Sequence, residues 1–230
     1  GSAANGIDDV LPKAYEEVWD GTTHSSSFHS FGASTQSGSV DYRTPSFDLG
    51  GATMSATYTY DPNAGAGAPS AGGVSSTAQS GQAVTAKISM AGLTLGGGYE
   101  EISTSKQSGD DNSVATGYIL YSNGPLSIGY QEMYNNGEHA SGTQGRDNEG
   151  DGYGISFSQD NYSLSYAEVE ETNKAVSATT TANSTVEMEA LQATYTMGAA
   201  TLGVSMYETN NPEGTTGKYE ETEISVSFAF

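Results

Sequence analysis

The sequence contains no cysteine and only one tryptophan. Without cysteine, neither a disulfide framework nor a thiolate metal site is available. Basic residues are also scarce: seven lysines and arginines stand against 28 aspartates and glutamates, so the formal net charge is −21 at pH 7. A field of this sign repels nucleic acid and attracts cations, including divalent ions. We therefore expect no nucleic-acid partner.

Long hydrophobic runs are absent as well. The chain has 35% hydrophobic residues and a mean hydropathy of −0.46, and its apolar runs are far shorter than the ~20 residues that a transmembrane helix requires. A chain that crosses a membrane without such a helix has to do so as a closed β-barrel, because lipid offers no partner for unpaired backbone groups.

What the sequence does contain is a period-two pattern, together with 15 tyrosines and 30 glycines. In 52–60, Met54, Ala56, Tyr58 and Tyr60 alternate with serine and threonine. Such strict alternation predicts a strand with one apolar face. The C-terminal stretch 218–230 shows it again, and its predicted lipid-facing residues are Ile224, Val226, Phe228 and Phe230. A terminal aromatic on that face suits the aromatic girdle of an outer-membrane barrel.

The connections between the predicted strands alternate in length. We count about eleven strands by their alternation, with tight turns near 48, 92, 124, 160 and 199 and long polar loops near 61, 106, 140, 177 and 213. The loop near 140 is expected to run from Asn135 to Asp151. Short turns at one rim and long loops at the other are typical of an outer-membrane barrel. A soluble β-sandwich is the alternative, but it lacks this rhythm. The predicted fold is therefore all-β, an antiparallel up-and-down transmembrane β-barrel.

Residues 1–37 do not follow the strand pattern. They carry an acidic stretch with one lysine and the single tryptophan. An acidic surface loop is the simplest interpretation of this segment. The remaining residues, 38–230, form the strands, turns and long external loops of the predicted barrel.

Several motifs resemble a known family. They are the segment Gly38-Ser-Val-Asp-Tyr-Arg-Thr-Pro-Ser-Phe47, the strand 52–58, the Asn-Gly-Pro-Leu turn at 123–126 followed by Gly129-Tyr130, and the terminal Phe230. Together they resemble the general porins of Gram-negative bacteria, which are trimeric, sixteen-stranded diffusion channels of the outer membrane. The resemblance covers nearly the whole chain.

The resemblance implies roles for individual residues. In this family the segment that Tyr42 and Arg43 match follows an inward-folded third loop that narrows the pore, so 1–37 corresponds to that constriction loop. Arg43 matches the basic cluster of the wall; the candidates for the acidic side of the constriction are Asp8, Asp9, Glu16, Glu17 and Asp20. Counted back from the end, the chain corresponds to the C-terminal portion of a porin, from that loop onward.

In a porin nothing is catalysed, so the expected function is passive diffusion of small hydrophilic solutes and ions. Arg43 and Lys87 lie on the polar faces of their predicted strands and should line the lumen, although an ion pair of Arg43 with Asp41 is an alternative. The excess of acidic residues predicts cation preference. An acid loop facing basic wall residues sets up a transverse field across the pore.

The remaining expectations concern partners and other functions. The resemblance implies a homotrimer in the bacterial outer membrane, in contact with lipid and lipopolysaccharide. We expect no cofactor and no specific metal site; the acidic loops would bind calcium or magnesium only loosely. An alternative function is an adhesin or a phage or partner receptor acting through the long loops. An enzyme is not expected, because no Ser/His/Asp group is recognisable and the three histidines lack metal-site spacing.

Overall fold

The computed structural model describes residues 10–15, 39–64, 79–103, 112–136, 146–175, 184–211 and 217–229, and the fold is described for these ranges. They contain β-strands joined by tight turns. Within the same ranges, no helix has the length and apolarity needed to cross a membrane.

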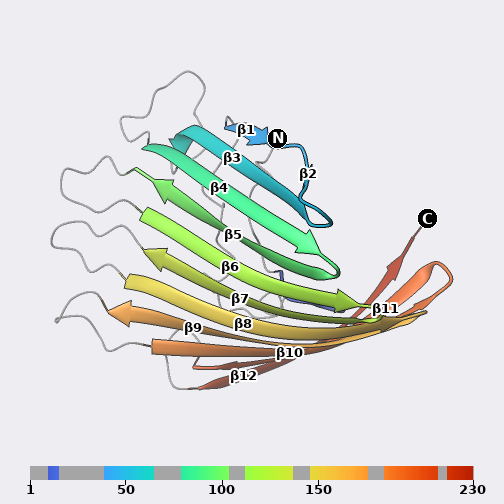
Figure 1. The fold of residues 1–230 in the computed structure, drawn as a ribbon. Helices are drawn as coiled ribbons and strands as arrows, with labels where there is room; N and C mark the ends of the chain where they lie inside the picture. The colour runs from blue at the N-terminus through green and yellow to red at the C-terminus, as the bar shows by residue number, and fades with distance from the viewer. Residues whose placement is uncertain are drawn as a thin grey trace.

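The strands form one sheet in which sequence neighbours pair. Its strands are β1 (Val40–Arg43), β2 (Phe47–Asp48), β3 (Thr53–Ala64), β4 (Gln79–Met90), β5 (Leu93–Ile102), β6 (Asn112–Asn123), β7 (Leu126–Asn136), β8 (Arg146–Gln159), β9 (Tyr162–Ala175), β10 (Ser184–Met197), β11 (Ala200–Asn210) and β12 (Lys218–Phe228). The order is β1-β3-β4 and onward to β12, with the short β2 paired to β3. This is the predicted antiparallel up-and-down meander (Figure 1).

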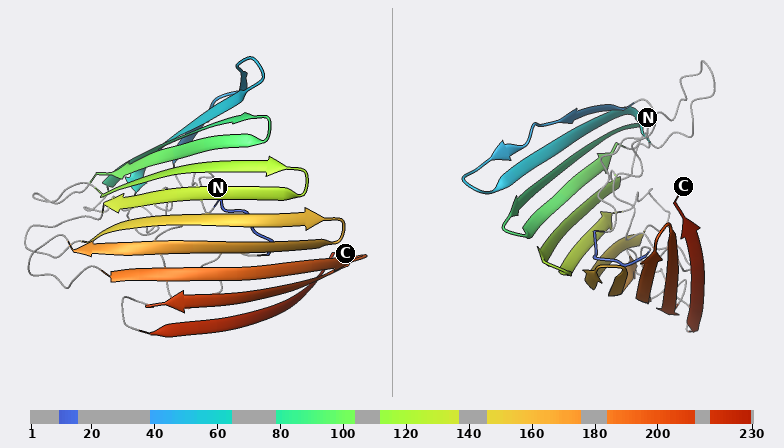
Figure 2. Two further views of the ribbon diagram at one scale, coloured as in Figure 1. Left: turned by 60° about the horizontal axis from the view of Figure 1, so that its bottom comes forward. Right: turned by 90° about the vertical axis from the view of Figure 1, so that its right-hand side faces the viewer.

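The sheet is strongly curved. Figure 2 shows it bent into an open arc, with β1 and β12 at its two edges. In the described part of the chain, β1 pairs only with β3, and β12 pairs only with β11. Tight turns lie along one rim, as between β4 and β5, where Gly92 has a φ of +85° that the turn requires. The arc therefore has a convex face, a concave face and two rims.

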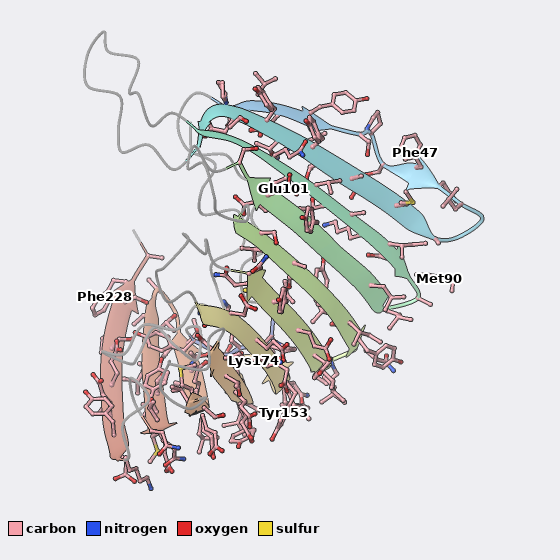
Figure 3. All side chains as sticks on the ribbon, turned by 90° about the vertical axis from the view of Figure 1, so that its left-hand side faces the viewer. Phe47, Met90, Glu101, Tyr153, Lys174 and Phe228 are labelled. Carbon is pink, nitrogen blue, oxygen red and sulfur yellow. The ribbon has the colours of Figure 1, made fainter. Side chains whose placement is uncertain are left out.

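The convex face is apolar and exposed. Ile128 is 46% exposed, Tyr153 46% and Val226 57%, and Figure 3 shows Tyr153 on the outer side of the arc. Ile224 (69%) and Phe228 (60%) continue the same surface on β12. A soluble protein does not normally expose a continuous apolar face of this extent. The predicted alternation is thus present, with its apolar face turned outward.

The strands extend farther than the alternation indicates. The acidic stretch 147–151 was expected to lie in a loop, but it belongs to β8, where Glu149 pairs with Thr172 and Asp151 with Glu170. That interpretation was wrong because the apolar alternation ends where the outward side chains become polar, while backbone pairing continues. The same physical reason explains the long ends of β9 and β10.

The sequence of β6 is apolar on both of its faces, and the residues that face the concave side explain this. Val114 on β6 is only 8% exposed and faces the concave side, although Ile119 on the convex side is 43% exposed. Val114 joins a small inner cluster whose members are Leu11, Met133, Ala167, Val169, Met188, Ala190 and Tyr207. In the described part of the chain, the concave face is therefore mostly polar but carries this apolar island.

Candidate functional site

A short N-terminal segment crosses the concave face of the sheet. Residues 10–15, here called the strap, lie inside the arc against the middle strands (Figure 2). The backbone N–H of Val10 donates to Gln131 Oε1 at 3.0 Å, and that of Ala14 to Ser165 Oγ at 2.8 Å. Tyr15 N–H donates to Gln192 Oε1 at 3.1 Å. These backbone N–H groups of the strap therefore donate to side-chain oxygens of the wall, where a strand would donate to backbone carbonyls.

Leu11 anchors the strap in the apolar island. Its side chain is 2% exposed, and it packs in a cluster with Val169 (0%) and Met188 (1%). Complete burial of a leucine contributes about 1.5–3 kcal/mol relative to an exposed one. The apolar residues of the concave wall thus serve to seat the strap.

Four glycines of the wall, Gly129, Gly152, Gly154 and Gly203, leave space for the strap, and two of them show this best. A Cβ atom added to Gly154 would lie 3.3 Å from Leu11 Cβ and from Pro12 Cδ. One added to Gly203 would lie 2.8 Å from the ring of Tyr15. A side chain at either position would occupy space that the strap fills. The sequence did not point to these glycines, because nothing in it places the strap above them.

A row of hydroxyl and amide side chains runs across the concave face beneath the strap. Each member is directly opposite the next in the strand register. The row is Ser127, Ser156, Ser165, Gln192, Ser205 and Glu223. Such a wall is compatible with water and offers hydrogen bonds to polar solutes. It ends at a carboxylate on the edge strand β12.

The two predicted basic wall residues lie toward the other edge of the sheet. Arg43 pairs with Thr57, and Lys87 pairs with Ser55. The buried Ala83 and Thr59 share their face, which is concave. Both basic side chains are exposed on that face. The structure thus brings Arg43 and Lys87 to one side of the arc.

Two wall carboxylates lie at the opposite side. Glu221 and Glu223 are half-buried on β12, opposite Tyr207 and Ser205 in the register. The sequence alone did not assign these acids to the pore. The predicted acidic residues Asp8, Asp9, Glu16, Glu17 and Asp20 lie outside the described residues, as does Phe230.

Acidic residues also form a ladder on the convex face, toward the rim opposite the tight turns. Directly opposed glutamates follow one another over four strands, and they are Glu168, Glu189, Glu208 and Glu220. Like charges in such pairs are destabilising. The Tyr166 hydroxyl offsets this repulsion by donating to Glu168 and Glu189 at 3.1 Å each. Lys218 pairs with Glu208 and Glu220 at 2.9 and 2.6 Å.

The described carboxylates do not form a metal site. Within the ranges that the structure covers, no group of three or more histidine, cysteine, aspartate or glutamate side chains is arranged to hold an ion. Glu221 instead accepts a hydrogen bond of 2.8 Å from the Tyr219 hydroxyl. Glu221 on the concave face, and Glu168 and Glu189 on the convex face, accept hydrogen bonds from tyrosine hydroxyls.

Comparison with known proteins bears on the fold. No protein-family model matches the chain, and a search of curated proteins found no match. Among solved structures, the chain is similar to one described as a porin refined at 1.8 Å resolution, with a TM-score of 0.58 and 15% sequence identity. The fold is porin-like.

The porin similarity covers 83% of this chain and 60% of the solved porin. This chain therefore spans about three fifths of the length of the porin that it matches. At 15% identity the likeness establishes the all-β, up-and-down transmembrane-barrel type of fold. It assigns no role to individual residues.

Proposed function

We propose that this chain forms the wall of an outer-membrane diffusion channel that passes small hydrophilic solutes and ions. The division of the curved sheet into two faces supports this function: exposed tyrosines, isoleucines and leucines cover the convex side, and the hydroxyl row crosses the concave side. Lipid solvates the first kind of surface and water the second. A diffusion channel requires no bond to be made or broken, so we propose no catalytic residue.

The strap narrows this channel on one side. It occupies the concave face from Val10 to Tyr15, and we assign residues 1–37 as a whole to an inward-folded constriction loop. Arg43 and Lys87 form the basic side of the passage. The acidic side combines wall residues Glu221 and Glu223 with the carboxylates of 1–37. Opposed charges of this kind favour polar solutes over apolar ones.

We propose that the channel prefers cations. Acidic residues outnumber basic ones by 28 to seven in the whole chain, and carboxylates near a pore raise the local concentration of cations. The acidic ladder of the convex face lies toward the loop rim, where we expect divalent cations to connect it to lipopolysaccharide phosphates. A homotrimer in the Gram-negative outer membrane is the proposed assembly.

Planar-bilayer recording of the native protein, purified from outer membranes, tests the proposal. We expect discrete conductance steps and a reversal potential in a KCl gradient of the sign that indicates potassium preference. Correct folding is checked independently by the shift in electrophoretic mobility between unheated and boiled samples. Folded, membrane-inserted protein without conductance would refute the channel. An anion-selective reversal potential would refute only the cation preference.

A further inference from the structure

The hydrogen-bonding partners of the strap lie on several different strands of the sheet. The strap is hydrogen-bonded to Gln131 on β7, Ser165 on β9 and Gln192 on β10. The Tyr15 hydroxyl extends this line to β12, where it donates to Glu223 Oε1 at 3.1 Å. The strap therefore runs across the strands, over half of the sheet.

The length of the strap is comparable to the width of wall that it crosses. Six residues of extended chain span at most ~20 Å. Six neighbouring strands at a spacing of ~4.8 Å cover ~24 Å along the wall. The side chains of Gln131 and Tyr15 provide the remaining reach at the two ends. A segment of this length that is held at both ends limits how far apart the strands that it joins can lie.

The acceptors that hold the strap are themselves connected to neighbouring strands. Gln131 is fully buried, and its Nε2 donates to Thr116 Oγ1 on β6 at 3.1 Å. Gln192 is 2% exposed; its Oε1 also accepts from Ser165 Oγ at 3.3 Å, and its Nε2 donates to the Tyr207 hydroxyl on β11 at 3.5 Å. These side chains thus connect the strap to β6 and β11 as well.

The edge strand β12 is the strand whose attachment to the sheet depends most on the strap. In the described residues its backbone pairs with β11 alone. The contact between Tyr15 and Glu223 gives β12 a second attachment, from inside the arc. Sheets are otherwise free to vary in twist and coil over a wide range.

We propose that the strap is an internal brace that fixes the curvature of the wall from β7 to β12, with Leu11 as its anchor and Tyr15 as its clamp on β12. This role goes beyond the proposed channel function and does not require it. A channel wall without the brace would keep its strands and its pairing, but its arc would vary in width.

A cysteine cross-link tests whether the strap is seated as described. The chain has no cysteine, so the double variant Ala14→Cys/Ser165→Cys contains the only pair of thiols. We expect this pair to form an intramolecular disulfide under mild oxidation of the folded protein. The control pair, Ala14→Cys with Thr85→Cys on β4, should stay reduced. Equal cross-linking of both pairs, or of neither, would overturn the proposed seat.

Distance measurement tests the brace itself. Spin labels at cysteines replacing Ile128 on β7 and Ile224 on β12 report the width of the arc from its convex side by pulsed electron resonance. We expect Leu11→Ala to broaden the distance distribution markedly and Tyr15→Phe to broaden it less. The matched variant Leu202→Ala, on the exposed convex face, should leave it unchanged.

The results of these distance measurements and of the conductance measurements distinguish the brace proposal from the channel proposal. Unchanged distributions in both Leu11→Ala and Tyr15→Phe would overturn the brace, whether or not the protein conducts. If Leu11→Ala does not fold, the Tyr15→Phe result decides, because that change removes only a hydroxyl. A native protein without conductance, but with a distribution that broadens in these variants, would refute the channel and support the brace.

Discussion

Tyr15 and Glu223 are 208 residues apart in the sequence, and they are joined by a hydrogen bond of 3.1 Å between the phenol hydroxyl and Oε1. The bond connects the strap to the last strand across the concave side of the sheet. It is partly buried, so water competes with it less than with an exposed contact. Its strength is open to measurement, because each partner has a close isostere.

Removal of this hydrogen bond should weaken the fold modestly. Tyr15→Phe deletes the donor and keeps the ring against Gly203, so we expect a loss of about 0.5–1.5 kcal/mol in the free energy of unfolding. Glu223→Gln keeps an acceptor oxygen and should cost less. Urea unfolding in lipid vesicles measures both values. The double variant should lose less free energy of unfolding than the sum of the two single-variant losses. A loss equal to that sum would show that the two residues do not interact.

Two glycine-to-alanine changes should have opposite effects. A Cβ at Gly152 would lie 2.9 Å from Val169 Cγ2 and 3.0 Å from Leu11 Cδ1, so Gly152→Ala should cost about 1–3 kcal/mol by overpacking. A Cβ at Gly117 meets no atom within 4 Å, so Gly117→Ala should be neutral or stabilising by up to about 1 kcal/mol. Unfolding in the same vesicles compares them directly. Similar effects of the two changes would contradict a seated strap.

Substitution by lysine at two adjacent positions of β7 should affect membrane insertion differently. Ile128 lies on the convex face, 46% exposed, and a lysine there would be placed in lipid at a cost of about 2–4 kcal/mol near the bilayer midplane. Ser127 faces the concave side, opposite Ser156. We expect Ile128→Lys to reduce membrane insertion strongly and Ser127→Lys to insert like the native protein. The heat-modifiable gel shift after vesicle insertion provides the measurement. The reverse order would show that the faces are exchanged.

Removal of a charge from the concave face should change ion selectivity. A unit charge about 10 Å from a permeating ion in water contributes ~0.4 kcal/mol. We therefore expect Glu221→Gln to lower the potassium-to-chloride permeability ratio about twofold. Glu170→Gln removes the same charge from the convex face, where Glu170 pairs with Glu187. This control should leave the reversal potential unchanged, and equal shifts would argue against the assigned lumen.

Much of the sheet could be predicted from the sequence because period-two alternation is a local property. The stretch 52–60 and the strand from Lys218 both have the faces that their alternation indicates, and each strand pairs with its neighbour in the chain. The limits of β8 could not be predicted in the same way. Once its outward residues become acidic, from Asp151 toward Arg146, pairing continues without an apolar signal.

The seat of the strap depends on contacts between distant parts of the chain, so alternation could not reveal it. Val114 and Met133 look misplaced on an otherwise polar face until Leu11 is seen to pack against them. Glu221 and Glu223 gain their position on the concave wall from the register between β11 and β12. Nothing local distinguishes them from the other acids of the chain.

The strap also bears on the order in which the molecule assembles. Apart from the pairing of β1 with β3, the described strands pair with their neighbours in the chain, so hairpins can form one after another at a small entropic cost. The strap contacts instead bridge 121, 151, 177 and 208 residues. They can form only after β7 to β12 are in place, which makes docking of the strap a late event. Loss of Leu11 should therefore accelerate unfolding and leave the folding rate nearly unchanged. Among the described residues, those that are synthesised first are the last to reach their native positions.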